Sequence, residues 1–88
     1  MLRQEQIDRI IALAKEYGAT RLILFGSTLE NPETARDIDL ACDGIEGWDL
    51  FAFAAKIENE FLISVDIVPL TPVSRFTQII ERDGKRLI

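Results

Sequence analysis

Three carboxylates in strand-like segments are the residues of this chain best placed to do chemistry. Asp37 and Asp39 alternate with apolar residues in the segment DIDLAC, and Asp66 stands at the centre of SVDIV. On a strand, residues i and i+2 point to the same face, with Cα atoms roughly 6.5–7 Å apart. Two carboxylates arranged in this way can converge on a divalent cation, or on two cations about 3.5–4 Å apart. If the two segments pair in register, all three carboxylates share one face of a sheet.

The types of residue present favour a hard cation at such a site. The chain has no histidine and one cysteine, Cys42, so histidine general bases, disulfide frameworks and thiolate zinc sites are excluded. Three neighbouring carboxylates repel and resist ionisation, and a bound cation removes that cost. A set of oxygen ligands suits Mg²⁺ or Mn²⁺ better than zinc. The alternative is that each acid faces solvent on the polar side of a one-sided sheet, although aspartate is a poor strand former.

Gly26 and Ser27 follow directly after the strand-like segment RLILF. Glycine allows a backbone to approach a ligand closely, and a serine that opens a turn or a helix offers N–H groups and a hydroxyl to a phosphate. Taken alone, the pair is explained more simply as an ordinary turn.

The elements that must position these residues follow from hydrophobic periodicity and from helix-ending and turn residues. We predict an α+β fold with a small mixed sheet of three or four strands, helices packed on one face and an open face that carries the carboxylates. Residues Asn31-Pro32 mark a loop. Helices are expected at 4–17, at 48–62 and from Thr71-Pro72 to Gly84, and strands at 21–25, 37–42 and 64–68, with KRLI available for a last short strand.

Composition narrows the functional classes. The chain has 88 residues, of which 48% are hydrophobic and 28% charged, so we expect one globular domain over residues 1–88. Its net charge of −5 argues against direct binding of a nucleic-acid backbone. No apolar run approaches the roughly 20 residues that span a bilayer, and the N-terminus has no signal-peptide core. We therefore expect a cytoplasmic protein that does not contact membranes.

The predicted helix at 48–62 has a second apolar stripe beside the one that would face the sheet. Phe51, Ala55 and Leu62 form this second stripe, which would suit a partner protein or a homodimer. The alternative is that Leu62 lies beyond the end of the helix and Phe51 is only half covered. The stripe expected to face the sheet is Leu50, Phe53, Ala54, Ile57 and Phe61.

The order of these motifs resembles that of the nucleotidyltransferases of the DNA polymerase β-like superfamily. Gly26-Ser27 is followed after nine residues by Asp37-Ile38-Asp39, and Asp66 follows on a later strand. The likeness is greatest to the small stand-alone domains called minimal nucleotidyltransferases. It covers nearly the whole chain, from the leading helix through LILFGS, DIDLA and VDIVPL to IIERDGKRLI.

This resemblance implies transfer of a nucleotidyl group, commonly AMP from ATP, onto a hydroxyl. Gly26 and Ser27 would hold the triphosphate, and Asp37 and Asp39 would bind two Mg²⁺ ions and the phosphates. Asp66 would ligate the catalytic metal and help to deprotonate the acceptor. The implied reaction is an in-line displacement at the α-phosphorus in which pyrophosphate leaves.

The resemblance also implies a partner. Members of this group are often paired with a helical HEPN-domain protein as a toxin–antitoxin couple in which the transferase is the antitoxin, and some modify a tyrosine of that partner with AMP. A HEPN-domain protein is therefore an expected partner of the stripe Phe51, Ala55 and Leu62.

The segment 28–36 departs from the pattern of the family. Relatives often have an arginine and small residues after Gly-Ser and a serine before the first aspartate, where this chain has Thr28-Leu29-Glu30 and Arg36. The segment contains two acids, which Arg36 would offset by pairing with the triphosphate. Two functions follow: an active transferase, or a catalytically weak or inactive module that neutralises or scaffolds a helical partner by contact.

Two other enzyme classes that use paired aspartates fit less well. Metal-dependent glycosyltransferases need a far larger sheet, and aspartyl phosphatases need a small hydroxyl residue where this chain has Ala41.

Overall fold

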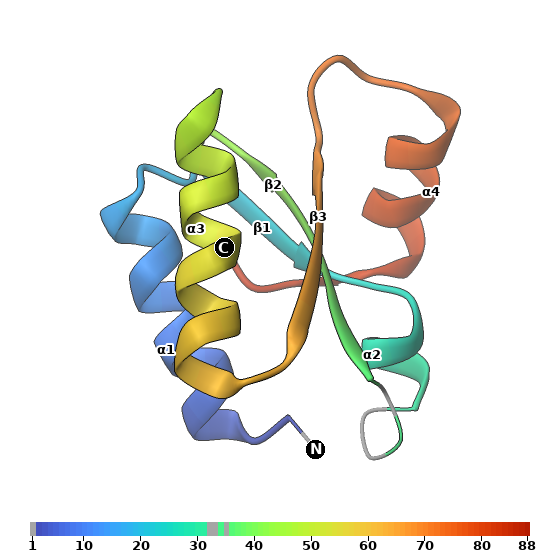
Figure 1. Ribbon diagram of the computed structural model, residues 1–88. Helices are drawn as coiled ribbons and strands as arrows, with labels where there is room; N and C mark the ends of the chain where they lie inside the picture. The colour runs from blue at the N-terminus through green and yellow to red at the C-terminus, as the bar shows by residue number, and fades with distance from the viewer. Residues whose placement is uncertain (1, 32–33, 35) are drawn as a thin grey trace.

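The structure is a computed structural model that describes residues 2–31, 34 and 36–88, so Pro32 of the predicted Asn31-Pro32 loop lies outside the described residues. Figure 1 shows an α+β architecture, as predicted. No helix in the described part of the chain has the length and apolar character needed to cross a membrane. In chain order the elements are α1 (Gln4–Glu16), β1 (Arg21–Leu24), α2 (Ser27–Glu30), β2 (Asp37–Asp43), α3 (Trp48–Phe61), β3 (Ser64–Pro69), α4 (Arg75–Asp83) and β4 (Lys85–Arg86).

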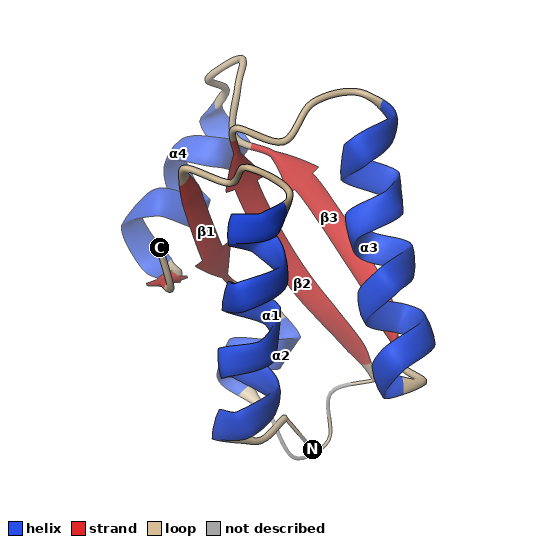
Figure 2. Ribbon diagram, turned by 90° about the vertical axis from the view of Figure 1, so that its left-hand side faces the viewer, coloured by secondary structure: helices blue, strands red, loops and turns tan. Residues whose placement is uncertain are grey.

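The four strands form one mixed sheet in the order β3-β2-β1-β4, which confirms the predicted sheet. β1 runs antiparallel to both β2 and β4, whereas β2 and β3 are parallel. Parallel neighbours need a crossover rather than a tight hairpin, and α3 supplies it. Figure 2 shows α1 and α3 side by side against the same face of the sheet.

The main core lies between this face and the two long helices. Alternate residues of β2 point into it, as the period-two pattern predicted, and both Ile38 and Leu40 are fully buried. Phe53 of α3 is also fully buried, and its ring lies 5.7 Å from that of Tyr17. The strands that carry the acids are therefore held from behind by a closely packed hydrophobic layer.

The opposite face is not fully open, which differs from the prediction of helices on one face only. α4 lies on this side of the sheet, where Ile23, Ala41, Leu70 and Ile80 form a second, smaller core (Figure 1). Ile23 and Ala41 are apolar positions on the carboxylate-bearing face and need cover. The sequence-based prediction treated this face as open because it carries the acids, so it left the apolar residues there without a covering helix.

The start of α4 also differs from the prediction. The helix begins at Arg75 rather than at Thr71-Pro72, because Ser74 is its N-cap and accepts a hydrogen bond from the Thr77 backbone N–H at 3.2 Å. The Thr71 hydroxyl instead donates to Asp43 at 3.0 Å. The apolar spacing of Val73, Phe76, Ile79 and Ile80 predicts that all four lie on the buried side of this helix. In the structure only Ile80 is buried, and the other three are exposed.

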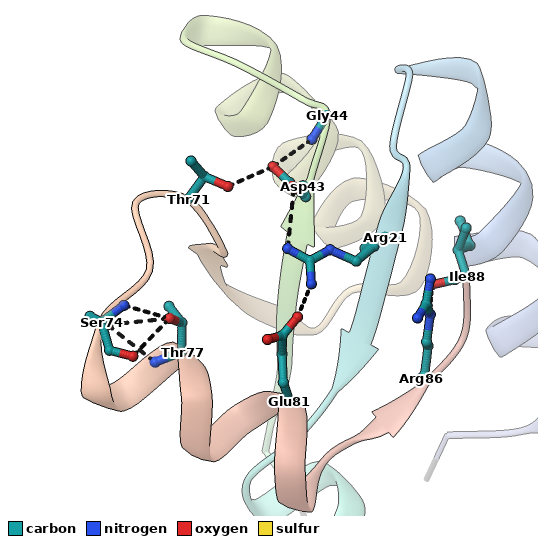
Figure 3. A network of polar contacts seen from close by, with 9 residues as sticks. All are labelled: Arg21, Asp43, Gly44, Thr71, Ser74, Thr77, Glu81, Arg86 and Ile88. Atoms are coloured by element: carbon teal, nitrogen blue, oxygen red, sulfur yellow. Dashed lines mark hydrogen bonds and ion pairs between the residues drawn. The ribbon is translucent and has the colours of Figure 1, made fainter.

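A polar network fastens α4 to the sheet (Figure 3). Arg21 of β1 donates to Asp43 at 3.2 Å and forms an ion pair with Glu81 of α4. The Thr71 hydroxyl and then Arg21 lower the pKa of Asp43. The network therefore holds Thr71, which precedes α4, and Glu81, near the end of α4, against the sheet.

β3 lies at an edge of the sheet, and its outer side is partly closed to further strands. The Val65 backbone N–H donates to the Glu58 carboxylate at 2.9 Å, and Pro69 has no N–H to offer. These two features remove donors that a neighbouring strand would need.

Substitutions of two phenylalanines on α3 test which side of the helix faces the core. Phe53→Ala should lower the free energy of unfolding by about 3–5 kcal/mol, since it empties a fully buried site. Phe51 is 64% exposed, so Phe51→Ala should change it by no more than about 0.5 kcal/mol. Urea unfolding of both variants measures the difference, and equal losses would show that the orientation of α3 is wrong.

Candidate functional site

The sheet brings the three predicted carboxylates onto one face. The parallel register of β2 and β3 pairs Asp39 with Asp66, and Asp37 with Ser64. Paired residues on neighbouring strands point to the same face, and the strands lie about 4.8 Å apart. Asp37 and Asp39 are half-buried, whereas Asp66 is exposed on the edge strand. The structure therefore places the third acid beside the first two and not on the other side of the sheet.

The carboxylates are neighbours but do not form a finished metal cluster. Within residues 2–31, 34 and 36–88, no three histidine, cysteine, aspartate or glutamate side chains are gathered closely enough to hold an ion. Like charges repel, and the exposed Asp66 side chain can change rotamer without losing packing. Sharing a cation would therefore require side-chain rotation, with the backbone already in register.

The Gly-Ser turn contacts the second carboxylate directly. Gly26 is the N-cap of α2 with φ of 67°, and a Cβ atom on it would lie only 2.6 Å from Asp39 Oδ2. Glycine is thus required here both by the backbone conformation and by the close approach. The Ser27 hydroxyl donates to the same carboxylate oxygen at 3.3 Å. The two motifs predicted from the sequence meet at Asp39.

Its surroundings raise the pKa of Asp39 above the ordinary value. Burial is the largest cause, and the neighbouring charges of Asp66 and Asp37 act in the same direction. Hydrogen bonds from the Ser27 hydroxyl and backbone oppose the shift without cancelling it. A raised carboxyl pKa beside two like charges is typical of a site that binds a cation, because the cation would stabilise the ionised form.

Sequence reasoning missed Thr28 as a member of the site. Its side chain is buried, and its Oγ1 atom donates to the Asp37 carbonyl oxygen and accepts from the Asp39 backbone N–H, both at 2.8 Å. The only signal in the sequence is a hydroxyl residue after Gly-Ser, which gives no hint of bonds to a strand nine to eleven residues later.

Arg36 is not brought onto the carboxylates. It is exposed just before the start of β2, and no ion pair joins it to another residue of the described part of the chain. Glu30, one of the two acids of segment 28–36, is also exposed, and the other, Glu33, lies outside the described residues.

The predicted second stripe of α3 is an exposed apolar surface on the other side of the molecule. Phe51 is 64% exposed, Ala55 is exposed, and Leu62 is 90% exposed. Leu62 lies just beyond the helix, at its left-handed C-cap position, as the alternative interpretation expected. Trp48, which the prediction omitted, is 85% exposed and its ring lies 5.9 Å from that of Phe51.

Comparison with known proteins identifies similar solved structures. No protein-family model matches the chain, and no curated protein does. A toxin–antitoxin structure with AMP-PNP is similar with a TM-score of 0.79 at 25% identity, covering 93% of this chain and 72% of that one. A structure described as a minimal nucleotidyltransferase has a TM-score of 0.73 at 26% identity and covers 92% and 88%.

A third structure has the same fold at lower identity. It is the tri-AMPylated Shewanella oneidensis HEPN toxin in complex with MNT antitoxin, with a TM-score of 0.76 at 24% identity, covering 99% of this chain and 72% of that one. These three structural neighbours are thus two toxin–antitoxin structures and one described as a minimal nucleotidyltransferase. Together with the site geometry, these similarities show that the chain has the fold of the minimal nucleotidyltransferases. This is the group whose Gly-Ser and Asp-x-Asp motifs its sequence resembles.

Proposed function

We propose that this protein is a metal-dependent nucleotidyltransferase that moves AMP, or another nucleoside monophosphate, from a nucleoside triphosphate to a hydroxyl group on a partner protein. The observation that carries the proposal is the register that pairs Asp39 with Asp66 directly beside the Gly26-Ser27 turn. A turn suited to phosphates and a group of carboxylates suited to cations are the two parts that phosphoryl-transfer chemistry needs.

The nucleotide would bind at the turn before α2. Gly26 allows close approach of the backbone, and Ser27 offers an N–H and a hydroxyl to the triphosphate. The exposed Arg36 would pair with the phosphates. The AMP-PNP in the similar toxin–antitoxin structure supports a nucleoside triphosphate as the ligand.

Asp37, Asp39 and Asp66 would hold the metal ions. Their oxygen-only donor set fits Mg²⁺, or Mn²⁺, and the raised pKa of Asp39 fits a site that gains from positive charge. Two such ions, when bound, supply charge neutralisation and alignment for the displacement at the α-phosphorus.

The protein's own groups would handle the acceptor. Asp66 is exposed on the edge strand, so it can reach an incoming hydroxyl and take its proton as general base. The acceptor oxygen then bonds to the α-phosphorus, the bond to the bridging oxygen breaks, and pyrophosphate leaves. Before the nucleotide binds, the Ser27 hydroxyl keeps Asp39 oriented through its hydrogen bond.

The acceptor would be a HEPN-type helical protein, with this chain as the antitoxin of a toxin–antitoxin pair in the cytoplasm. The exposed surface of Trp48, Phe51, Ala55 and Leu62 would bind that partner, or a second copy of the chain. α3 lies on the side of the sheet opposite to the acids, so binding there leaves the carboxylates accessible.

One observation favours the second candidate, a weakly active or inactive binding module. The described residues contain no three carboxylates already gathered for a metal, and Glu30 adds negative charge close to the Gly-Ser turn. Such a module would neutralise its partner through the α3 surface alone.

A labelling experiment separates the two candidates. Wild-type protein with Mg²⁺ and ATP should label its HEPN-type partner with AMP; Asp39→Asn should abolish labelling, and Asp66→Asn should lower its rate by about 10²–10⁴-fold. Asp43→Asn is the matched control, because Asp43 lies on the same strand but is bound by Arg21 and Thr71. Wild-type protein that copurifies with its partner and never labels it would favour the binding module.

The raised pKa of Asp39 predicts that the folding stability of the metal-free protein decreases with rising pH. Because the folded state holds the Asp39 proton more tightly than the unfolded state, stability falls as pH rises from the ordinary aspartate value through the raised one. Asp39→Asn should therefore melt at a higher temperature than wild type at neutral pH, and the difference should shrink in acid. Added Mg²⁺ should raise the wild-type melting temperature and leave Asp39→Asn unchanged. A lower melting temperature for Asp39→Asn at every pH would contradict this electrostatic account.

Substitution on α3 tests the partner surface. Phe51→Glu places a charge in the exposed apolar surface and should dissociate the complex without unfolding the chain, as measured by gel filtration and circular dichroism. Lys56→Glu is the control, since Lys56 is exposed on the same helix outside that surface. An unchanged elution volume for Phe51→Glu would remove this surface from the proposal.

A further inference from the structure

A buried hydroxyl lies between the Gly-Ser turn and the strand of acids. The Thr28 side chain is 2% exposed, although it belongs to the single short turn of α2. Its Oγ1 atom is bonded on two sides, donating to the Asp37 carbonyl and accepting from the Asp39 N–H, both at 2.8 Å. Both distances are those of well-formed hydrogen bonds.

The Thr28 hydroxyl bonds to β2 just beyond the point where β1 ends. β1 pairs with β2 only as far as Leu24 opposite Leu40, and the Phe25 N–H makes a last bond to the Asp39 carbonyl. The next two polar groups of β2 on this side, the Asp39 N–H and the Asp37 carbonyl, would otherwise have no partner in the ladder. Thr28 satisfies both with one hydroxyl, where a continued antiparallel strand would use backbone groups of two residues.

The same residue connects the two halves of the candidate site. Gly26 and Ser27 precede Thr28 directly, and their positions against Asp39 depend on where α2 sits. A shift of α2 away from β2 would separate the phosphate-binding turn from the carboxylates. The two bonds of Thr28 are therefore placed to set the distance between them.

We propose that Thr28 is a positioning residue, which fixes the backbone of Asp37 and Asp39 and holds the Gly26-Ser27 turn against the Asp39 carboxylate. This inference rests on the proposed function, because it concerns the arrangement of the same metal and nucleotide site. Thr28 touches neither ligand and acts only through the residues that do. Segment 28–36, which departs from the family pattern, thus contributes Thr28 as a support for the site.

The chain provides a matched control for a purely structural role. Thr77 in α4 is 4% exposed, and its hydroxyl also bridges a backbone pair, accepting from the Ser74 N–H at 2.8 Å and donating to the Ser74 carbonyl at 3.0 Å. It lies outside the candidate site. Thr77→Val therefore removes an equivalent buried hydroxyl with the same change in shape as Thr28→Val.

Metal affinity is the first measurement. The protein and its variants Thr28→Val, Thr28→Ser and Thr77→Val are titrated with Mn²⁺ alone, and the free ion is followed by electron paramagnetic resonance. Thr28→Val should weaken Mn²⁺ binding by about 10–100-fold, the usual effect of losing a group that orients metal ligands. Thr28→Ser keeps the hydroxyl and should bind as wild type does, and so should Thr77→Val.

Hydrogen exchange is the second measurement and does not depend on any ligand. The Asp39 amide should exchange faster in Thr28→Val than in wild type, and Thr77→Val should leave it protected. If Thr28→Val binds Mn²⁺ as Thr77→Val does, or keeps the Asp39 amide protected, the positioning role is overturned and the proposed function stands. If wild-type protein itself binds no Mn²⁺, the proposed function fails, and the positioning role fails with it.

Discussion

The parallel register of β2 and β3 is the constraint on which the rest of the structure depends. It places Asp39 and Asp66 side by side, and a slip of one residue would turn one of them into the core. The register itself is set by the hydrophobic residues between the acids, since Ile38 and Val65 must both face α1 and α3. Packing on one side of the sheet thus determines the electrostatics on the other.

This arrangement has an energetic cost that the fold must offset. Asp39 is half-buried beside two like charges, and the Ser27 hydrogen bonds compensate only in part. Such local destabilisation is common where function requires charged groups to lie close together. Here a closely packed layer behind the strand holds the charges in place, with Phe53 fully buried at its centre.

The sequence predicted the parts of the fold that depend on local periodicity. Strict alternation in DIDLAC identified the face of Asp37 and Asp39, and nearly all helix and strand ends lie within a residue or two of their expected positions. What could not be predicted depends on contacts distant in the chain. Thr71 looked like a helix cap because its bond to Asp43 was unknown, and Thr28 looked like a loop residue because its partners lie on another element. The exposed side of α4 was misjudged for the same reason, since apolar spacing does not reveal how little of a helix touches the sheet.

The outer edge of β3 affects whether copies of this protein can associate by extending one another's sheets. An open edge in a small sheet invites other copies to add strands and build continuous ribbons. Glu58 engages the Val65 amide and Pro69 offers none, so the border next to Asp66 gives an approaching backbone fewer donors to bind. An acid can therefore stand at the rim of the sheet, open to visiting molecules, while the chains themselves are discouraged from polymerising through it.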